Sequence, residues 1–172
     1  MRTTLKVSTV LSWINIFIGS FIAFSCLMGM LLMQNLGIVI FTVLIGGVIL
    51  HSFATLQLRK SIINPAIPLS SQTPVGIRFI GFIALFFSIL GIINAVAAIG
   101  SAEEVVKLAD QNYLQKGVNW VAVFRIIGVV FLIFSIGVAM NVFMSTRLLR
   151  WYLLSKRRKR RINLSLKIYR CT

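Results

Sequence analysis

The stretch GFIALFFSILGIINAVAA, from Gly81 to Ala98, decides the fold because it contains no charge and places small residues regularly. The small residues recur at spacings of three, four, three, four and three, and they are Gly81, Ala84, Ser88, Gly91, Ala95 and Ala98. Residues three and four apart lie on one face of an α-helix, and small side chains let membrane helices approach closely. The stretch therefore predicts a membrane helix at the packing centre of the fold, which contacts its neighbours through this small-residue seam.

Three more apolar segments accompany this one. The chain of 172 residues is 58% hydrophobic and 12% charged, whereas a soluble domain has roughly 45–50% apolar and about 25% charged residues. The apolar segments cover about residues 7–33, 36–56, 77–99 and 120–144, and each reaches the roughly 20 residues that cross a bilayer as a helix. We predict an all-α, multi-pass integral membrane protein with a four-transmembrane-helix bundle in residues 1–146, including an outer loop at 100–119.

The first apolar segment has a second interpretation as a signal peptide, because Arg2 and Lys6 precede it. Its apolar run continues past Cys26, however, and is longer than the apolar region of about 7–15 residues in a signal peptide. We therefore expect a retained helix.

The basic residues predict the orientation of the chain. Fifteen of the 18 lysines and arginines fall on one side of a four-pass chain, in residues 2–6, 59–78 and 147–170. The opposite side contains all three acidic residues, Glu103, Glu104 and Asp110. The excess of positive charge in cytoplasmic segments then places both termini in the cytoplasm. Short connections favour a bacterial cytoplasmic (inner) membrane.

The basic C-terminal tail, residues 147–172, follows the last apolar segment directly. Its densest part is Lys156, Arg157, Arg158, Lys159, Arg160 and Arg161. Each such charge is attracted to anionic lipid by roughly 1 kcal/mol, so we expect contact with anionic headgroups. A protein or ribosomal-RNA contact is the alternative, and a dedicated nucleic-acid-binding role is disfavoured. Ile162–Tyr169 alternates with period two as a strand does, but a lone strand is unstable, and we expect an interfacial or disordered tail.

Polar residues inside the apolar segments form two predicted layers. Asn15, His51, Ser52 and Asn141 lie near the cytoplasmic ends, while Asn94 and Arg125 lie near the outer ends. Such groups mark a candidate functional site by default. The structural alternative is that Arg125 pairs with Glu103 or Glu104 or bonds Asn94, and that His51 bonds Asn15, Asn141 or a backbone carbonyl.

The residue inventory disfavours catalysis. The chain has a single histidine and two distant cysteines, Cys26 and Cys171, and no carboxylate lies in an apolar segment. We therefore expect neither a catalytic residue nor a cofactor or metal site. The preferred function is an accessory, assembly or regulatory subunit that acts through helix packing with a protein partner or as a homo-oligomer. The alternative is a small oligomeric transporter, channel or lipid-handling protein that uses the polar groups.

Overall fold

The computed structural model describes residues 2–33, 35–64, 66–67, 69–70, 72–108 and 118–169. Within them the helices are α1 (Arg2–Met33), α2 (Leu36–Ile63), α3 (Thr73–Gly100), α4 (Ala102–Leu108) and α5 (Trp120–Tyr169), and no strand is formed. Four of these helices, α1, α2, α3 and α5, are long and apolar enough to cross a membrane. This confirms an all-helical chain with four candidate membrane spans.

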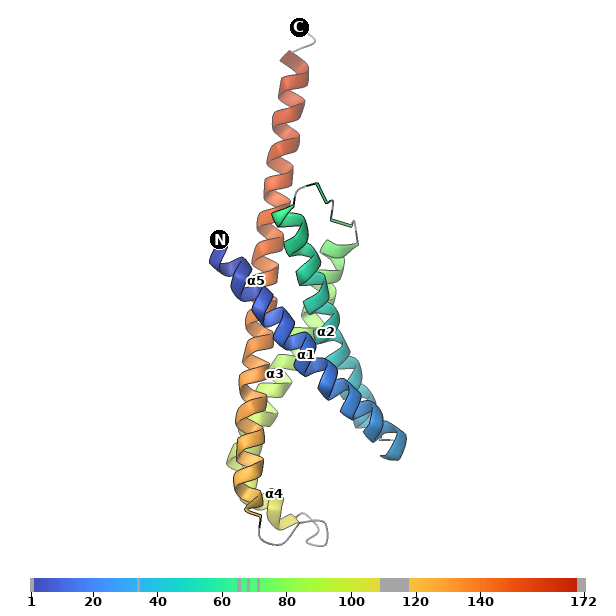
Figure 1. The fold of residues 1–172 in the computed structure, drawn as a ribbon, viewed down its shortest axis with the longest axis vertical. Coiled ribbons are helices and arrows are strands. Elements are labelled where there is room, and N and C mark those ends of the chain that lie inside the picture. Colours follow the sequence, from blue (N-terminus) through green and yellow to red (C-terminus); the bar gives the residue numbers. More distant parts are fainter. Residues whose placement is uncertain are drawn as a thin grey trace.

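The four long helices run alternately in opposite directions (Figure 1). At one end, which we call the tail end, α1 and α3 begin, α2 ends and α5 leaves the bundle; the other end carries α4 (Figure 1). α1 packs along α2, and α3 packs along α5. The two pairs meet toward the tail end and diverge toward the α4 end, so that the molecule is forked (Figure 1).

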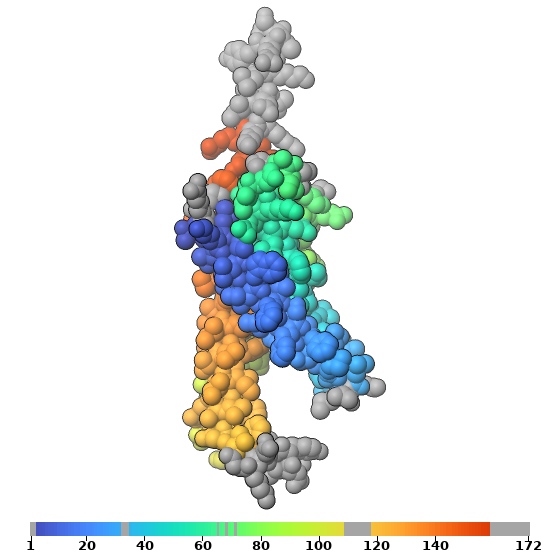
Figure 2. Space-filling view, in the orientation of Figure 1, coloured from blue at the N-terminus to red at the C-terminus, as the bar shows by residue number. Residues whose placement is uncertain are grey.

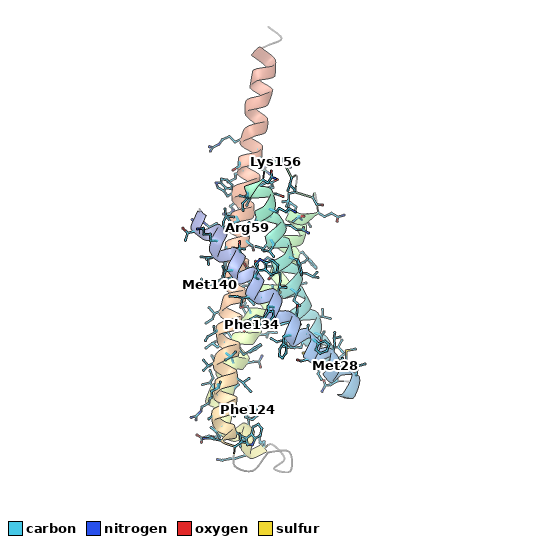
Figure 3. All side chains as sticks on the ribbon, viewed as in Figure 1. Met28, Arg59, Phe124, Phe134, Met140 and Lys156 are labelled. Atoms are coloured by element: carbon cyan, nitrogen blue, oxygen red, sulfur yellow. The ribbon has the colours of Figure 1, made fainter. Side chains whose placement is uncertain are left out.

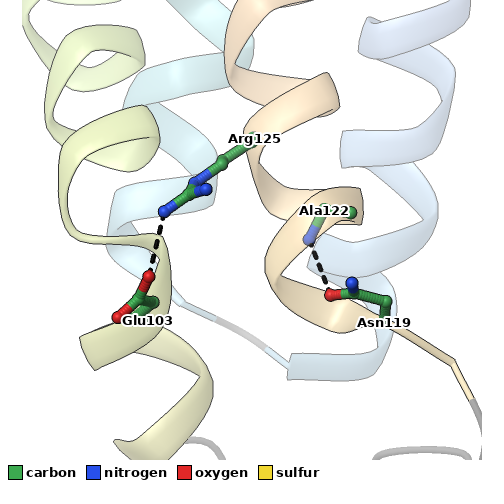
Figure 4. Close-up of polar contacts among 4 residues, drawn as sticks. All are labelled: Glu103, Asn119, Ala122 and Arg125. Carbon is green, nitrogen blue, oxygen red and sulfur yellow. Dashed lines mark hydrogen bonds and ion pairs between the residues drawn. The ribbon is translucent and has the colours of Figure 1, made fainter.

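Local capping sets several helix ends. The Asn35 side chain accepts a hydrogen bond of 2.7 Å from the Gly37 N–H at the start of α2. Asn119 does the same for the Ala122 N–H at 3.1 Å, just before α5 (Figure 4). Asparagine is a preferred N-cap because it satisfies one of the free N–H groups of the first turn. α3 has Pro74 in its first turn, where a missing N–H costs nothing.

Two apolar clusters form the core. The larger one centres on Phe87, which is 1% exposed and whose ring centroid lies 5.6 Å from Phe41, 6.1 Å from Phe131 and 6.3 Å from Phe134. Tilted and edge-on rings at such separations are the favoured aromatic arrangement. The smaller cluster consists of Leu58, Ile77, Leu148 and Leu149. The core therefore joins α2, α3 and α5, whereas α1 contributes only partly buried side chains to it.

The last helix is much longer than the apolar pattern predicts. α5 continues to Tyr169 instead of ending near residue 144, so the part of the tail up to Tyr169 is helical, and its placement at the membrane interface stays a prediction. Ile162–Tyr169 is helical despite its strand-like pattern. The physical reason is that no glycine or proline follows Gly137, while leucine, lysine and arginine favour helix. The side chains of residues 159–169 lie outside the described part of the chain.

α3 and α5 are the two central helices of the bundle. α3 packs against α2, α4 and α5, but α1 does not reach it. α5 contacts each of the other four helices. The seam helix is thus a central partner of α5, and α5 itself is the helix that connects the whole bundle.

Candidate functional site

A buried polar cluster links three of the long helices near the tail end. Asn141 of α5 is its hub: its Oδ1 accepts hydrogen bonds from Ser12 Oγ at 3.2 Å and Ser8 Oγ at 3.3 Å, both on α1. Its Nδ2 donates to Ser52 Oγ of α2 at 3.5 Å. One side chain of α5 therefore holds both helices of the α1–α2 pair.

His51 of α2 forms the second half of the cluster. Its Nε2 lies 2.9 Å from Ser145 Oγ on α5, and Ser145 also donates to the Val142 carbonyl at 2.9 Å. The ring lies against the seam, because a Cβ added at Gly81 would come within 3.1 Å of the His51 Cε1 atom. The Ile77 carbonyl, one turn before Gly81, also interacts with the ring. Gly81 therefore provides the space that the imidazole occupies.

The polar cluster is buried and nearly self-contained. Its six residues are each at most 2% exposed, and they are Ser8, Ser12, His51, Ser52, Asn141 and Ser145. Buried polar groups need hydrogen-bond partners, and these residues find them in one another and in adjacent carbonyls. The His51 Nδ1 atom is the one member atom without a partner in good geometry among the described residues. The arrangement is a hydrogen-bonded contact between helices, and it does not form a polar channel open to solvent.

The seam forms the contact between α3 and α5. Gly81, Ala84, Ser88, Gly91 and Ala95 are buried and Ala98 is half-buried, while Phe82 on another face is 71% exposed. Ser88 Oγ donates to the Ser135 carbonyl of α5 at 2.8 Å. A Cβ added at Gly128 of α5 would lie 3.3 Å from the Ala95 carbonyl oxygen. Small residues on both helices thus bring the two backbones together.

An apolar groove opens where the fork divides. It has a volume of about 780 Å³, and we call it the α1–α5 groove. α1 contributes residues from Leu11 to Ile22, and α5 contributes residues from Ile126 to Met140. Figure 2 shows the two pairs separating below the point where α1 crosses α5, and Figure 3 shows Met28 on the diverging arm, away from Phe134 in the middle. Asn15, which is 2% exposed, is the polar residue of an otherwise apolar lining.

Arg125 and Asn94 lie apart from the polar cluster. Arg125 Nη2 is 3.0 Å from Glu103 Oε1 at the α4 end, and the two side chains are 50% and 64% exposed (Figure 4). An ion pair this exposed contributes about 0–1 kcal/mol. Asn94 donates to the Leu90 carbonyl of its own helix at 2.8 Å. The six residues of the two predicted layers therefore separate into an exposed ion pair, an exposed amide, a groove residue and three members of the polar cluster.

The basic run of the tail lies on α5 beyond the bundle. Lys156, Arg157 and Arg158 are exposed, and Figure 3 shows Lys156 where α5 rises past the ends of the other helices. The side chains of Lys159, Arg160 and Arg161 fall outside the described residues.

Ser8, Ser12 and Ser145 belong to the polar cluster but were not predicted from the sequence. Serine can bond the carbonyl one turn earlier in its own helix, so a lone serine in an apolar segment carries little signal. The available signal was their spacing: Ser8 and Ser12 are four residues apart, as are Asn141 and Ser145.

Comparisons of the chain with protein-family models, curated proteins and solved structures found no match.

Proposed function

We propose that this protein is a non-catalytic accessory or assembly subunit of a membrane complex and that it binds one transmembrane helix of a partner protein in the α1–α5 groove. The proposal rests on the difference between the two ends of the bundle. At one end the helices are joined by hydrogen bonds, and at the other they leave an apolar groove. Polar side chains bond one another where the helices meet. An apolar groove remains where the helices diverge.

The lining of the α1–α5 groove favours a helix as its occupant. The α5 wall from Ile126 to Met140 is about 21 Å long at 1.5 Å per residue, which is four turns. Within it Gly137 leaves open space, because an added Cβ would meet only Leu11, at 3.8 Å. The opposite wall contains Asn15. A small residue that permits close approach and an amide that can hydrogen-bond are the usual features of contacts between membrane helices.

The orientation that we propose places the tail end and both termini in the cytoplasm of a bacterium. Lys60, Arg78, Arg147 and Lys156 lie at or beyond the tail end, whereas Glu103 and Glu104 belong to α4 at the opposite end. This asymmetry supports the assignment, since cytoplasmic segments of membrane proteins are enriched in lysine and arginine. The α1–α5 groove then opens toward the outer leaflet of the inner membrane.

Lipid handling is the second candidate function. It is favoured by the volume of about 780 Å³ and the apolar lining of the same groove, which suit an acyl chain. A transport path along Arg125, Asn94 and His51 has less support, because these side chains do not share one site.

Site-specific photocrosslinking tests the proposal. A benzophenone amino acid is placed at Ile133, which lines the α1–α5 groove and is 66% exposed. The matched control is Val43 of α2, which is 65% exposed and does not line this groove. We expect Ile133 to form an adduct with one other protein in native membranes and Val43 to form none. Gly137→Leu should abolish the adduct by filling the groove, whereas Gly46→Leu, where an added Cβ meets no atom within 4 Å, should leave it intact.

Three results would overturn the partner proposal. Adducts with lipid alone would support the second candidate, and adducts of twice the mass of the chain would show that a second copy occupies the groove. Equal labelling from Ile133 and Val43 would show that the groove is an ordinary lipid-facing surface.

A further inference from the structure

A second surface, at the tail end between α3 and α5, combines charge with an apolar floor. Two adjoining hollows of about 340 and 470 Å³ share Arg78, Thr146 and Arg150 in their linings. We call them together the α3–α5 groove. They are separate from the α1–α5 groove, with which they share no lining residue.

Arginines from two helices converge on this groove. Arg78 comes from the second turn of α3, and Arg147, Arg150 and Arg157 come from α5. The α5 positions are separated by three and seven residues, so they lie on one helix face. All four side chains are exposed. The charge is thus concentrated along one line between the helices.

The floor of the groove is apolar on its membrane side. Phe82 and Leu85 of α3 and Phe143 of α5 line it toward the middle of the helices. The two helices run antiparallel (Figure 1). Residues after Arg78 therefore lie deeper in the bundle than Arg78 itself. The same is true of residues before Arg147 on α5. The larger hollow therefore has arginines at its tail end and apolar side chains toward the middle of the helices, and Leu149, Leu153 and Leu154 line the smaller hollow beside Arg150 and Arg157.

Among the described residues, no acidic side chain lies at this end. The three acidic residues of the chain all lie between positions 103 and 110, and Glu103 and Glu104 are on α4 at the opposite end of the bundle. Glu103 also pairs with Arg125. An anion that enters this groove therefore meets no described carboxylate that competes for the four arginines.

We infer that the α3–α5 groove binds one anionic phospholipid of the leaflet at the tail end. Its phosphate would lie between Arg78 and Arg150, since guanidinium groups match phosphate oxygens in a two-point contact. Its acyl chains would follow Phe82, Leu85 and Phe143. Basic pockets between transmembrane helices recognise headgroups in this way. This site is distinct from the diffuse attraction of the tail for an anionic surface, and it does not depend on the proposed partner in the α1–α5 groove.

Native mass spectrometry of the full chain in detergent measures the binding of single lipids. The probes are phosphatidylglycerol and phosphatidylcholine with identical acyl chains. We expect one phosphatidylglycerol to be retained in preference to phosphatidylcholine. Arg78→Gln with Arg150→Gln should weaken its binding about 25-fold, which is about fivefold for each charge. The matched control, Lys156→Gln with Arg158→Gln, removes the same charge outside the groove and should change binding less than about twofold.

A third variant separates the groove from its charge. Thr146→Trp keeps every arginine and fills the centre of the groove, and it should also abolish the preferential retention. Equal losses in the two double-glutamine variants would show diffuse attraction and overturn the inference. Equal retention of both lipids would do the same, as would displacement by glycerol phosphate at the concentration at which the lipid itself binds, because the ligand would then be a free phosphate ester.

Discussion

Asn141 forms hydrogen bonds with side chains of two other helices, and this makes it the most connected polar residue of the described chain. Its amide is fully buried. Each hydrogen bond that it loses therefore leaves a buried polar group without a partner. Hydrogen bonds between membrane helices average about 0.6 kcal/mol each because the unfolded helices find other partners in the membrane. Each hydrogen bond of the polar cluster therefore stabilises the bundle only slightly, and the cluster stabilises it through the sum of these bonds.

Replacement of this hub should destabilise the bundle measurably. We predict that Asn141→Ala lowers the free energy of unfolding by about 1–2 kcal/mol, as expected for three such bonds. Unfolding by sodium dodecyl sulfate in mixed micelles measures this quantity. Asn94→Ala is the control: Asn94 is exposed and bonds its own helix, so its loss should stay within about 0.5 kcal/mol. Equal effects of the two variants would show that the polar cluster does not hold the helices.

At the scale of elements, α3 and α5 depend on close backbone approach. Gly91 lies against Ser135 and Phe131 of α5, and a Cβ added at Gly91 would clash with the Ser135 Oγ atom. Gly128 faces Ala95 and Ile99 in the same way. The contact would be lost if either helix carried larger side chains at these positions.

The matched pair of glycines tests this contact. We predict that Gly91→Leu destabilises the bundle by about 1–3 kcal/mol, the usual cost of overpacking. Gly46→Leu inserts the same side chain into open space and should be tolerated. The same mixed-micelle titration compares them. Comparable stability of the two variants would contradict the seam as the site of close packing.

The sequence predicts those helices that are marked by a pattern of neighbouring residues along the chain. The four apolar segments and the seam follow from runs and spacings of residues such as Gly81 and Gly91. The end of α5 was not predictable from the apolar pattern, because hydropathy falls at Arg147 while helix propensity does not. The polar cluster cannot be predicted from the sequence unless it is known which helices contact one another. Asn141 and His51 stand out as polar residues in apolar segments, but their serine partners depend on the approach of both α1 and α2 to α5.

At the scale of the whole molecule, the distribution of charge follows the same axis as the fork of the bundle. Most of the basic residues lie toward the tail end, where the helices meet, whereas Glu103 and Glu104 lie on α4 at the end where the helices diverge. α5 is about 75 Å long at 1.5 Å per residue, which exceeds a hydrocarbon core of about 30 Å. Its distal part therefore extends beyond the membrane on the tail side.

Cysteine labelling tests the proposed orientation. In a background with Cys26→Ala and Cys171→Ser, the exposed residues Glu104 and Lys156 are replaced one at a time by cysteine. We predict that an impermeant maleimide labels Glu104→Cys in intact cells and labels Lys156→Cys only after the inner membrane is opened. The reverse pattern would place the α4 end in the cytoplasm.

The central claim is that a partner protein is bound through the α1–α5 groove, and native mass spectrometry of intact assemblies released from membranes tests it most directly. We predict a stoichiometric second protein bound to the native chain and to Gly46→Leu, and its loss from Gly137→Leu. An assembly that contains copies of this chain only, or a partner retained equally by Gly137→Leu, would contradict the claim.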